Sequence, residues 1–343
     1  MKRLLRNLLL IIVPIGSLVV VVNYCVDPAN IFFGREYVAG ISDILAKGHN
    51  VDNVANYDER ALQEQMVRKL PYQPDIVVLG SSRVMELGTS FFPGKKVLNC
   101  GVSHANINDV LAITGLLDSM GRLPEEIVIN LDPHLICLGG TSEWQSLSPY
   151  HRFYLQRIHH PETTLSQPLF FSKAITLLSF EYFEKSLAFV SQHKTKHYQD
   201  VGKERPAKYG RFWDGTICYP PSYDFPDTAK VAGDARVVGN REETTLDPEK
   251  LQQLNDLLDY LATRKVKVML VMLPYHMEYY REMNGRYRNI FPGYDTLFRK
   301  MARERDIPIL GGFDAVGMGI PENKFYDSYH CSKEAIKKTL NYN

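Results

Sequence analysis

Three residues that could act together on an acyl group lie at two distant points of the chain. Asp327 and His330 are three positions apart near the end of the sequence, and Ser82 follows an apolar run far upstream. A serine hydroxyl is a weak nucleophile until a histidine removes its proton and a carboxylate orients that histidine. The sequence therefore predicts a Ser82–His330–Asp327 triad. A helix-capping serine, a turn aspartate and an exposed histidine would give the same residue types.

The order of these short motifs resembles the SGNH (GDSL-like) hydrolase superfamily, and within it the membrane-anchored DltD/AlgJ-like branch. Gly80-Ser81-Ser82 stands where the superfamily has G-D-S after its first core strand, and Asp327 and His330 match its D-x-x-H. The resemblance implies that Ser82 is the nucleophile, that His330 is the base and that Asp327 orients it. It extends over roughly residues 70 to 335.

The same resemblance implies an oxyanion hole formed by the backbone amides of Ser82 and Gly101. A helix beginning at Ser82 would also direct its exposed amides and its positive dipole end at the developing oxyanion. The third superfamily motif, G-x-N-D, is replaced here by Ile129-Asn130-Leu131-Asp132-Pro133, so the side-chain donor of the oxyanion hole stays unassigned.

Four further residues are candidates for substrate binding, and each has a structural alternative. Asp132 could position substrate or could hydrogen-bond turn amides, and Arg83 could bind an anionic group or form an ion pair. Asn99 could contact substrate or connect two loops. Trp213 could stack on sugar rings, whereas the adjacent Asp214-Gly215 could simply form a β-hairpin turn.

Short apolar runs bounded by turn residues predict buried parallel strands. These runs are Asp75–Leu79, Lys96–Cys100, Glu126–Leu131, Val266–Leu273 and the weaker Ile307–Leu310. Helical periodicity is present over Tyr57–Leu70, Asn106–Met120, Pro248–Arg264 and Tyr294–Arg305. The alternation predicts an α/β domain with a doubly wound, flavodoxin-like parallel sheet of about five strands. Such sheets place their sites beyond the carboxyl ends of the strands.

We expect three parts in the chain: a transmembrane anchor at 1–25, a linker and surface helix at 26–70, and an SGNH-like α/β domain at 71–343. Within that domain the alternation stops over 135–247. We interpret 135–247 as a helical and irregular insertion, with helical patterns over Phe170–His193, that partly covers the site.

The N-terminus is typical of an uncleaved membrane anchor. Three basic residues lie among the first six, and the stretch from Leu4 to Tyr24 is close to the ~20 residues that cross a bilayer as a helix. Because the cations come first, the positive-inside rule predicts a cytoplasmic N-terminus and an extracytoplasmic domain. A cleaved signal peptide is the alternative, although Val20–Cys25 contains no small-x-small cleavage site.

Composition excludes several other classes of protein. The 40 basic and 39 acidic residues nearly balance, so nothing indicates binding to nucleic acid. The five cysteines show no CxxC spacing and the histidines no HExxH spacing, so we expect no metal site and no disulfide framework. Cys100 and Cys137 adjoin apolar runs, which is typical of small core residues.

The resemblance implies an extracytoplasmic acyl esterase or O-acyltransferase that acts on a cell-envelope polysaccharide or glycopolymer without a cofactor. The anchored branch usually acts beside a membrane-bound O-acyltransferase, which would then be the partner protein. The alternative from another class is a non-catalytic glycan-binding or assembly protein with the same fold. The replaced G-x-N-D motif favours that alternative, and the intact Ser82, Asp327 and His330 disfavour it.

Overall fold

A five-stranded parallel sheet lies at the centre of the α/β body, with strand order β3-β2-β4-β8-β9. The strands are β2 (Ile76–Leu79), β3 (Val97–Asn99), β4 (Glu126–Asn130), β8 (Lys267–Met272) and β9 (Ile309–Gly311). The computed structural model describes residues 2–28, 30, 32–140, 143–158, 176–191, 197–236 and 245–341. Four of the predicted runs contain one of these strands and the weaker fifth run, Ile307–Leu310, overlaps β9, so the predicted parallel sheet is confirmed.

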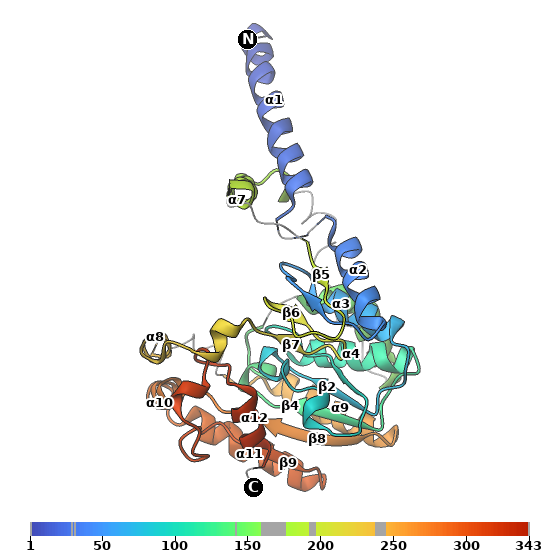
Figure 1. The fold of residues 1–343 in the computed structure, drawn as a ribbon, viewed down its shortest axis with the longest axis vertical. Coiled ribbons are helices and arrows are strands. Elements are labelled where there is room, and N and C mark those ends of the chain that lie inside the picture. The colour runs from blue at the N-terminus through green and yellow to red at the C-terminus, as the bar shows by residue number, and fades with distance from the viewer. Residues whose placement is uncertain are drawn as a thin grey trace.

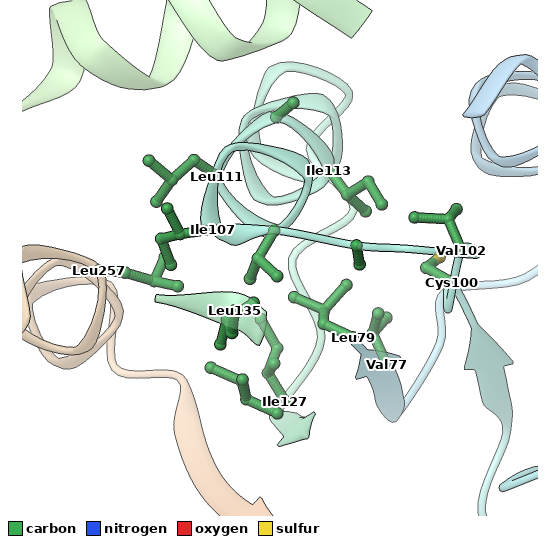
Figure 2. Packing of buried hydrophobic residues seen from close by; sticks show 14 of the residues in the cluster. Val77, Leu79, Cys100, Val102, Ile107, Leu111, Ile113, Ile127, Leu135 and Leu257 are labelled. Atoms are coloured by element: carbon green, nitrogen blue, oxygen red, sulfur yellow. The ribbon is translucent and has the colours of Figure 1, made fainter. Parts of the chain in front are cut away.

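The two faces of the sheet belong to two separate apolar clusters. Val77 and Leu79 of β2 enter the larger cluster, whereas Ile76 and Val78 enter the smaller one. Successive side chains of a strand point to opposite faces, so a strand that is covered on both faces is apolar throughout. Figure 2 shows the larger cluster, where α4 (Ile107–Ser119) lies over side chains from the sheet.

Helices contribute apolar side chains to both clusters. Those in the larger cluster are α2 (Gly34–Ala46), α3 (Glu59–Lys69), α4, α5 (Ser148–Arg157), α9 (Pro248–Thr263), α10 (Met277–Arg286) and α11 (Ile290–Glu304). Helix α12 (Lys333–Leu340) contributes Ala335 and Ile336 to the smaller cluster. The four helices predicted from periodicity correspond to α3, α4, α9 and α11, with ends that shift by a few residues.

The range predicted as a linker contains structure that the sequence analysis did not predict. Helix α2 packs on α3 and buries Val38, Ile41 and Leu45, which follow helical spacing. A small antiparallel sheet has the order β5-β1-β6-β7. Its strands are β1 (Val51–Asp52), β5 (Gln199–Asp200), β6 (Gly210–Arg211) and β7 (Ile217–Cys218). Strands of two residues are too short to show a periodic pattern.

The predicted insertion at 135–247 is not a separate layer throughout. Helix α5 packs closely on α4, and its Tyr154 and Leu155 are buried in the main cluster. Farther along are α7 (Phe180–Ser191), the strands β5 to β7 and α8 (Thr228–Asp234). Part of the predicted helical stretch Phe170–His193 lies outside the described residues.

Helix α1 (Lys2–Val26) covers the predicted anchor and extends away from the α/β body (Figure 1). Helix α7 packs beside it at Asn23, whose fully buried amide donates to the carbonyl oxygens of Leu177 and Ser179, each at 3.0 Å. In the part of the chain that the structure describes, no helix is both long enough and apolar enough to cross a bilayer.

Candidate active site

The serine of the candidate site lies in a tight turn after β2. Gly80 has φ +148°, and a Cβ at that position would lie 2.6 Å from the Cβ of Asn130, so the turn requires glycine. Ser81 is extended, and its hydroxyl accepts a hydrogen bond from the Arg83 amide at 3.4 Å. Ser82 then begins a short 3-10 helix, Ser82–Val84. This geometry leaves Ser82 just beyond the carboxyl end of β2.

The position of Ser82 within the sheet is also informative. Strand β2 lies between β3, the next strand of this sheet along the chain, and β4, the one after that. The chain therefore leaves β2 in one direction and returns on its other side, which makes the gap between β2 and β4 a topological switch point. Ligands of open α/β sheets bind in the crevice beyond the strand ends at such a point.

The aspartate and the histidine lie on a short loop that closes on itself. Phe325 and Cys331 pair as an isolated antiparallel bridge, and the Tyr326 amide donates to the His330 carbonyl oxygen at 2.9 Å. Asp327 Oδ1 accepts hydrogen bonds from the amides of Tyr329 at 2.7 Å and His330 at 2.8 Å. One carboxylate oxygen therefore fixes the loop, and the other remains available to the histidine ring.

The structure brings Ser82, His330 and Asp327 together at hydrogen-bond distance. His330 Nδ1 lies 2.7 Å from Asp327 Oδ2, and His330 Nε2 lies 2.7 Å from Ser82 Oγ. In the neutral tautomer that satisfies both contacts, Nδ1–H donates to Asp327 and Nε2 accepts the Ser82 hydroxyl proton. We refer to these three residues as the triad.

The triad carboxylate is held in its ionised form. Burial opposes ionisation of Asp327, but the hydrogen bonds from the His330 ring and from the amides of Tyr329 and His330 outweigh burial. They hold the pKa of Asp327 below its ordinary value. An ionised Asp327 fixes the orientation of the imidazole and stabilises the imidazolium that would form when Ser82 loses its proton.

Arg83 and Asp132 form a buried ion pair beside the triad, which is the structural alternative given for Arg83. Asp132 Oδ1 also accepts from the His134 amide at 3.1 Å, the turn contact that was the alternative for Asp132. Arg83 Nη1 lies 2.5 Å from Asp132 Oδ2, and both side chains are almost fully buried. The guanidinium also donates to the Leu273 and Pro274 carbonyl oxygens, and its Nε donates to the Tyr329 carbonyl oxygen at 3.2 Å. The Arg83 guanidinium therefore connects the residues that follow β4 and β8 to the histidine loop.

Asn99 and Gly101 are also used within the structure. The Asn99 amide donates to the carbonyl oxygens of Val84 at 2.7 Å and Leu87 at 2.9 Å, and its Oδ1 accepts from the Gly101 amide at 2.8 Å. Asn99 is fully buried. It therefore connects the serine turn to β3 and does not face substrate. The Gly101 amide, predicted as an oxyanion donor, is already engaged.

Trp213 lies in the hairpin between β6 and β7, as the structural alternative predicted. Gly215 has φ +85° and its amide donates to the Phe212 carbonyl oxygen at 2.9 Å. The Trp213 ring meets Tyr72 with centroids 6.0 Å apart, and its amide donates to Asn50 Oδ1 at 3.0 Å. These contacts fix Trp213 near the edge of the sheet and involve no member of the triad.

The sequence analysis missed two groups near the site. The Arg83 guanidinium carbon lies 3.7 Å from the centroid of the Tyr275 ring. The Tyr275 hydroxyl donates to Asp132 Oδ1 at 2.9 Å. Glu86 is buried, and burial raises its pKa to about 7. The positive charge of Lys333 and a hydrogen bond from Tyr326 only partly oppose this increase. A charged residue between Met85 and Leu87 was a signal in the sequence, whereas nothing near Tyr275 indicated its contacts.

Comparison of the chain with protein-family models and with curated proteins gives no match. Among the described residues, no group of three or more His, Cys, Asp or Glu side chains is arranged to hold a metal ion. Within the same residues the Ser82 amide, at the start of its 3-10 helix, has no hydrogen-bond partner. The chemistry of the site therefore has to be argued from the triad and its surroundings.

Proposed function

We propose that the protein is a serine-dependent acyl esterase or O-acyltransferase with an SGNH-like, doubly wound α/β fold. The observation that carries the proposal is the pair of 2.7 Å contacts that His330 makes with Ser82 and with Asp327. Nucleophile, base and orienting carboxylate are the three roles that acyl transfer through a serine requires. Their position at a switch point of the sheet supports the same conclusion.

The reaction has two half-reactions that share an acyl-enzyme. Ser82 Oγ bonds to the acyl carbon of a donor ester while His330 Nε2 takes the hydroxyl proton. The bond from that carbon to the donor oxygen breaks, and the proton leaves with the donor alcohol. An acceptor hydroxyl then bonds to the acyl carbon and gives its proton to His330. The Ser82 ester bond breaks, and the proton returns to Oγ. Water as acceptor gives an esterase, and a polymer hydroxyl gives a transferase.

The oxyanion that forms in each step needs hydrogen-bond donors. The Ser82 amide is the donor that we propose, because it has no partner in the described residues and begins a helical turn. The Gly101 amide would have to leave Asn99 Oδ1 or share its proton with the oxyanion. This occupied amide favours the second candidate function, a non-catalytic glycan-binding or assembly protein with the same fold.

For the substrate, we infer an ester on a cell-envelope polysaccharide or glycopolymer, as the DltD/AlgJ-like resemblance implies. We propose that α1 anchors the protein in the membrane, with the N-terminus in the cytoplasm and the α/β domain outside. A membrane-bound O-acyltransferase would be the partner that delivers the acyl group. The apolar side chains that α1 exposes, among them Leu10, Ile12 and Leu18, support this arrangement.

Replacement of the nucleophile separates the two candidate functions. Ser82→Ala removes one hydroxyl, so a binding protein would keep its stability and its effect on the polymer. An enzyme would lose turnover by about a thousandfold or more, because only binding and oxyanion stabilisation would remain. The measurements are polymer acylation in cells and release of p-nitrophenol from p-nitrophenyl acetate by purified full-length protein.

Ser81→Ala is the matched control. Ser81 is the neighbouring serine and contacts Asn130 rather than His330, so its replacement should retain most of the turnover. The catalytic proposal fails if Ser82→Ala protein is folded, present at the normal level, and leaves both polymer acylation and ester cleavage unchanged.

A further inference from the structure

Four tyrosine rings gather at the histidine loop, three from one segment of the chain and one, Tyr326, from the loop itself. Tyr219 and Tyr223 are stacked, with centroids 4.9 Å apart and planes at 17°. Tyr209 meets both of them edge-on, with centroids at 5.7 and 5.6 Å. Tyr326 contacts the same pair at 5.3 and 5.4 Å. We call these four residues the tyrosine cluster. Three of them come from the segment that was predicted to cover the site.

The tyrosine cluster adjoins the triad directly. Tyr326 immediately precedes Asp327, and its amide donates to the His330 carbonyl oxygen at 2.9 Å. Burial is the main reason that the pKa values of Tyr209 and Tyr219 are raised, and the negative charge of Asp327 adds to both increases. Both phenols therefore lie within electrostatic reach of the triad carboxylate.

The tyrosine cluster is not closed off as a core would be. Tyr209 is 39 % exposed, and the other three rings are partly exposed. The hydroxyls of Tyr209 and Tyr223 contact each other, so the polar edges meet at one point of the cluster. A tyrosine presents a large apolar face and a hydroxyl at small conformational cost. This combination suits a pyranose ring, which has an apolar C–H face and a rim of hydroxyls.

We propose that the tyrosine cluster is the acceptor subsite, where one pyranose ring of a polysaccharide stacks on Tyr209 and directs a hydroxyl towards the acyl group on Ser82. This inference rests on the proposed function and adds the class of acceptor to it. Tyr219 and Tyr223 contact the Tyr209 ring directly, and Tyr326 packs against that pair. The subsite belongs to the second half-reaction, in which the acceptor hydroxyl bonds to the acyl carbon.

The first test compares two rates in purified full-length protein. The acyl donor is p-nitrophenyl acetate, and the acceptors are cellohexaose, mannohexaose and chitohexaose. The measured quantity is the ratio of sugar acetylation to p-nitrophenol release. Tyr209→Ala should lower this ratio about tenfold or more and raise the acceptor KM, because it removes the stacking face. Tyr209→Phe retains the face and should retain most of the ratio.

Phe225→Ala is the matched control. Phe225 lies in the same segment and is 86 % exposed, but it makes no ring contact with the tyrosine cluster within the described residues. Its replacement should leave the ratio within about twofold of the parent value. A Tyr209→Ala ratio and acceptor KM equal to those of the parent protein would overturn the acceptor subsite.

A binding measurement separates this inference from the proposed function. Saturation-transfer NMR on Ser82→Ala protein detects the same three oligosaccharides without turnover. Binding should be present in Ser82→Ala and lost in the double variant Ser82→Ala/Tyr209→Ala. If Ser82→Ala still cleaves ester at the parent rate, the proposed function fails, while the binding result still decides on the subsite. If none of the three sugars binds or is acetylated, the acceptor subsite is wrong.

Discussion

Arg83 and Asp132 show how one pair of residues can fit two roles until its surroundings are known. A guanidinium and a carboxylate beside a candidate nucleophile suit an anionic substrate, and they suit a buried ion pair equally well. In the structure the two residues form the ion pair. The planar guanidinium of Arg83 donates to the Asp132 carboxylate and to three backbone carbonyl oxygens at once. Removing one partner of such a pair would leave a buried charge unpaired.

A second residue, Glu86, predicts how the folding stability of the protein depends on pH. Its pKa rises from 4.5 to about 7 in the folded protein, with burial as the main cause. Between these two values the unfolded chain has released the proton that the folded protein still holds, so folding stability falls as pH rises through this window. Glu86→Gln cannot titrate. Relative to the parent protein, it should gain unfolding free energy between about pH 5 and about pH 8, by up to about 3 kcal/mol.

Equilibrium denaturation in urea at both pH values measures this gain. Glu125→Gln is the control, since that side chain is 76 % exposed, and its effect on stability should be the same at both pH values. A Glu86→Gln variant whose stability relative to the parent does not change with pH would show that Glu86 ionises normally in the folded state.

The turn after β2 is the element on which the candidate site depends most. It joins a strand buried on both faces to a 3-10 helix within two residues, Gly80 and Ser81. Asn99 fastens this turn to β3, and Arg83 fastens it to the ends of β4 and β8. The serine is thereby held by neighbouring strands, so its hydroxyl meets the histidine without support from substrate.

Substitution of Gly80 tests this element. Gly80→Ala combines an unfavourable φ of +148° with a Cβ 2.6 Å from the Cβ of Asn130. We expect a loss of about 2–5 kcal/mol in unfolding free energy, from backbone strain and from overpacking. Gly121→Ala is the matched control, because Gly121 has φ +65° and open space around a Cβ. It should lose only about 1–2 kcal/mol. Equal losses in the two variants would show that Asn130 moves aside freely.

At the scale of the whole molecule, the site is assembled from segments that are far apart in the chain. Ser82 and His330 are 248 positions apart and meet at 2.7 Å. The tyrosine cluster adds Tyr209 and Tyr223 from the middle of the sequence. Helix α1 lies apart from the five-stranded sheet and extends away from the α/β body (Figure 1). Its exposed apolar side chains need a different environment from that of the α/β body.

The proposed anchor predicts where the protein is found after cell lysis. The full-length protein should sediment with membranes and resist a carbonate wash, because the apolar side chains that α1 exposes, among them Leu10, Ile12 and Leu18, would be removed from water in the membrane. A variant that begins at Asn23 retains the side chain that donates to the Leu177 and Ser179 carbonyl oxygens and should move to the soluble fraction. Full-length protein found uncut in the soluble fraction would refute the anchor. Protein cut between Val22 and Asp27 would indicate a signal peptide instead.

Local pattern in the sequence was enough for the strands and for most helices of the α/β body. Continuous apolar runs such as Ile76–Leu79 are typical of strands that are covered on both faces. Such strands can therefore be recognised in the sequence without knowing which elements cover them. Helix α2 was missed although Val38, Ile41 and Leu45 follow helical spacing. The strands β1 and β5 could not have been found, because two residues define no period, whereas the turn residues Asp214-Gly215 indicated the hairpin of β6 and β7.

The sequence by itself determined which residue types were available for chemistry and which of them directly follow a strand. Ser82 follows a buried strand, and the Asp327–His330 spacing lets one carboxylate oxygen hold the loop while the other holds the ring. Only the tertiary structure decided which neighbours face substrate. Arg83, Asn99 and Asp132 turn inward because buried polar groups must find partners, and those partners come from segments that no local pattern connects to them.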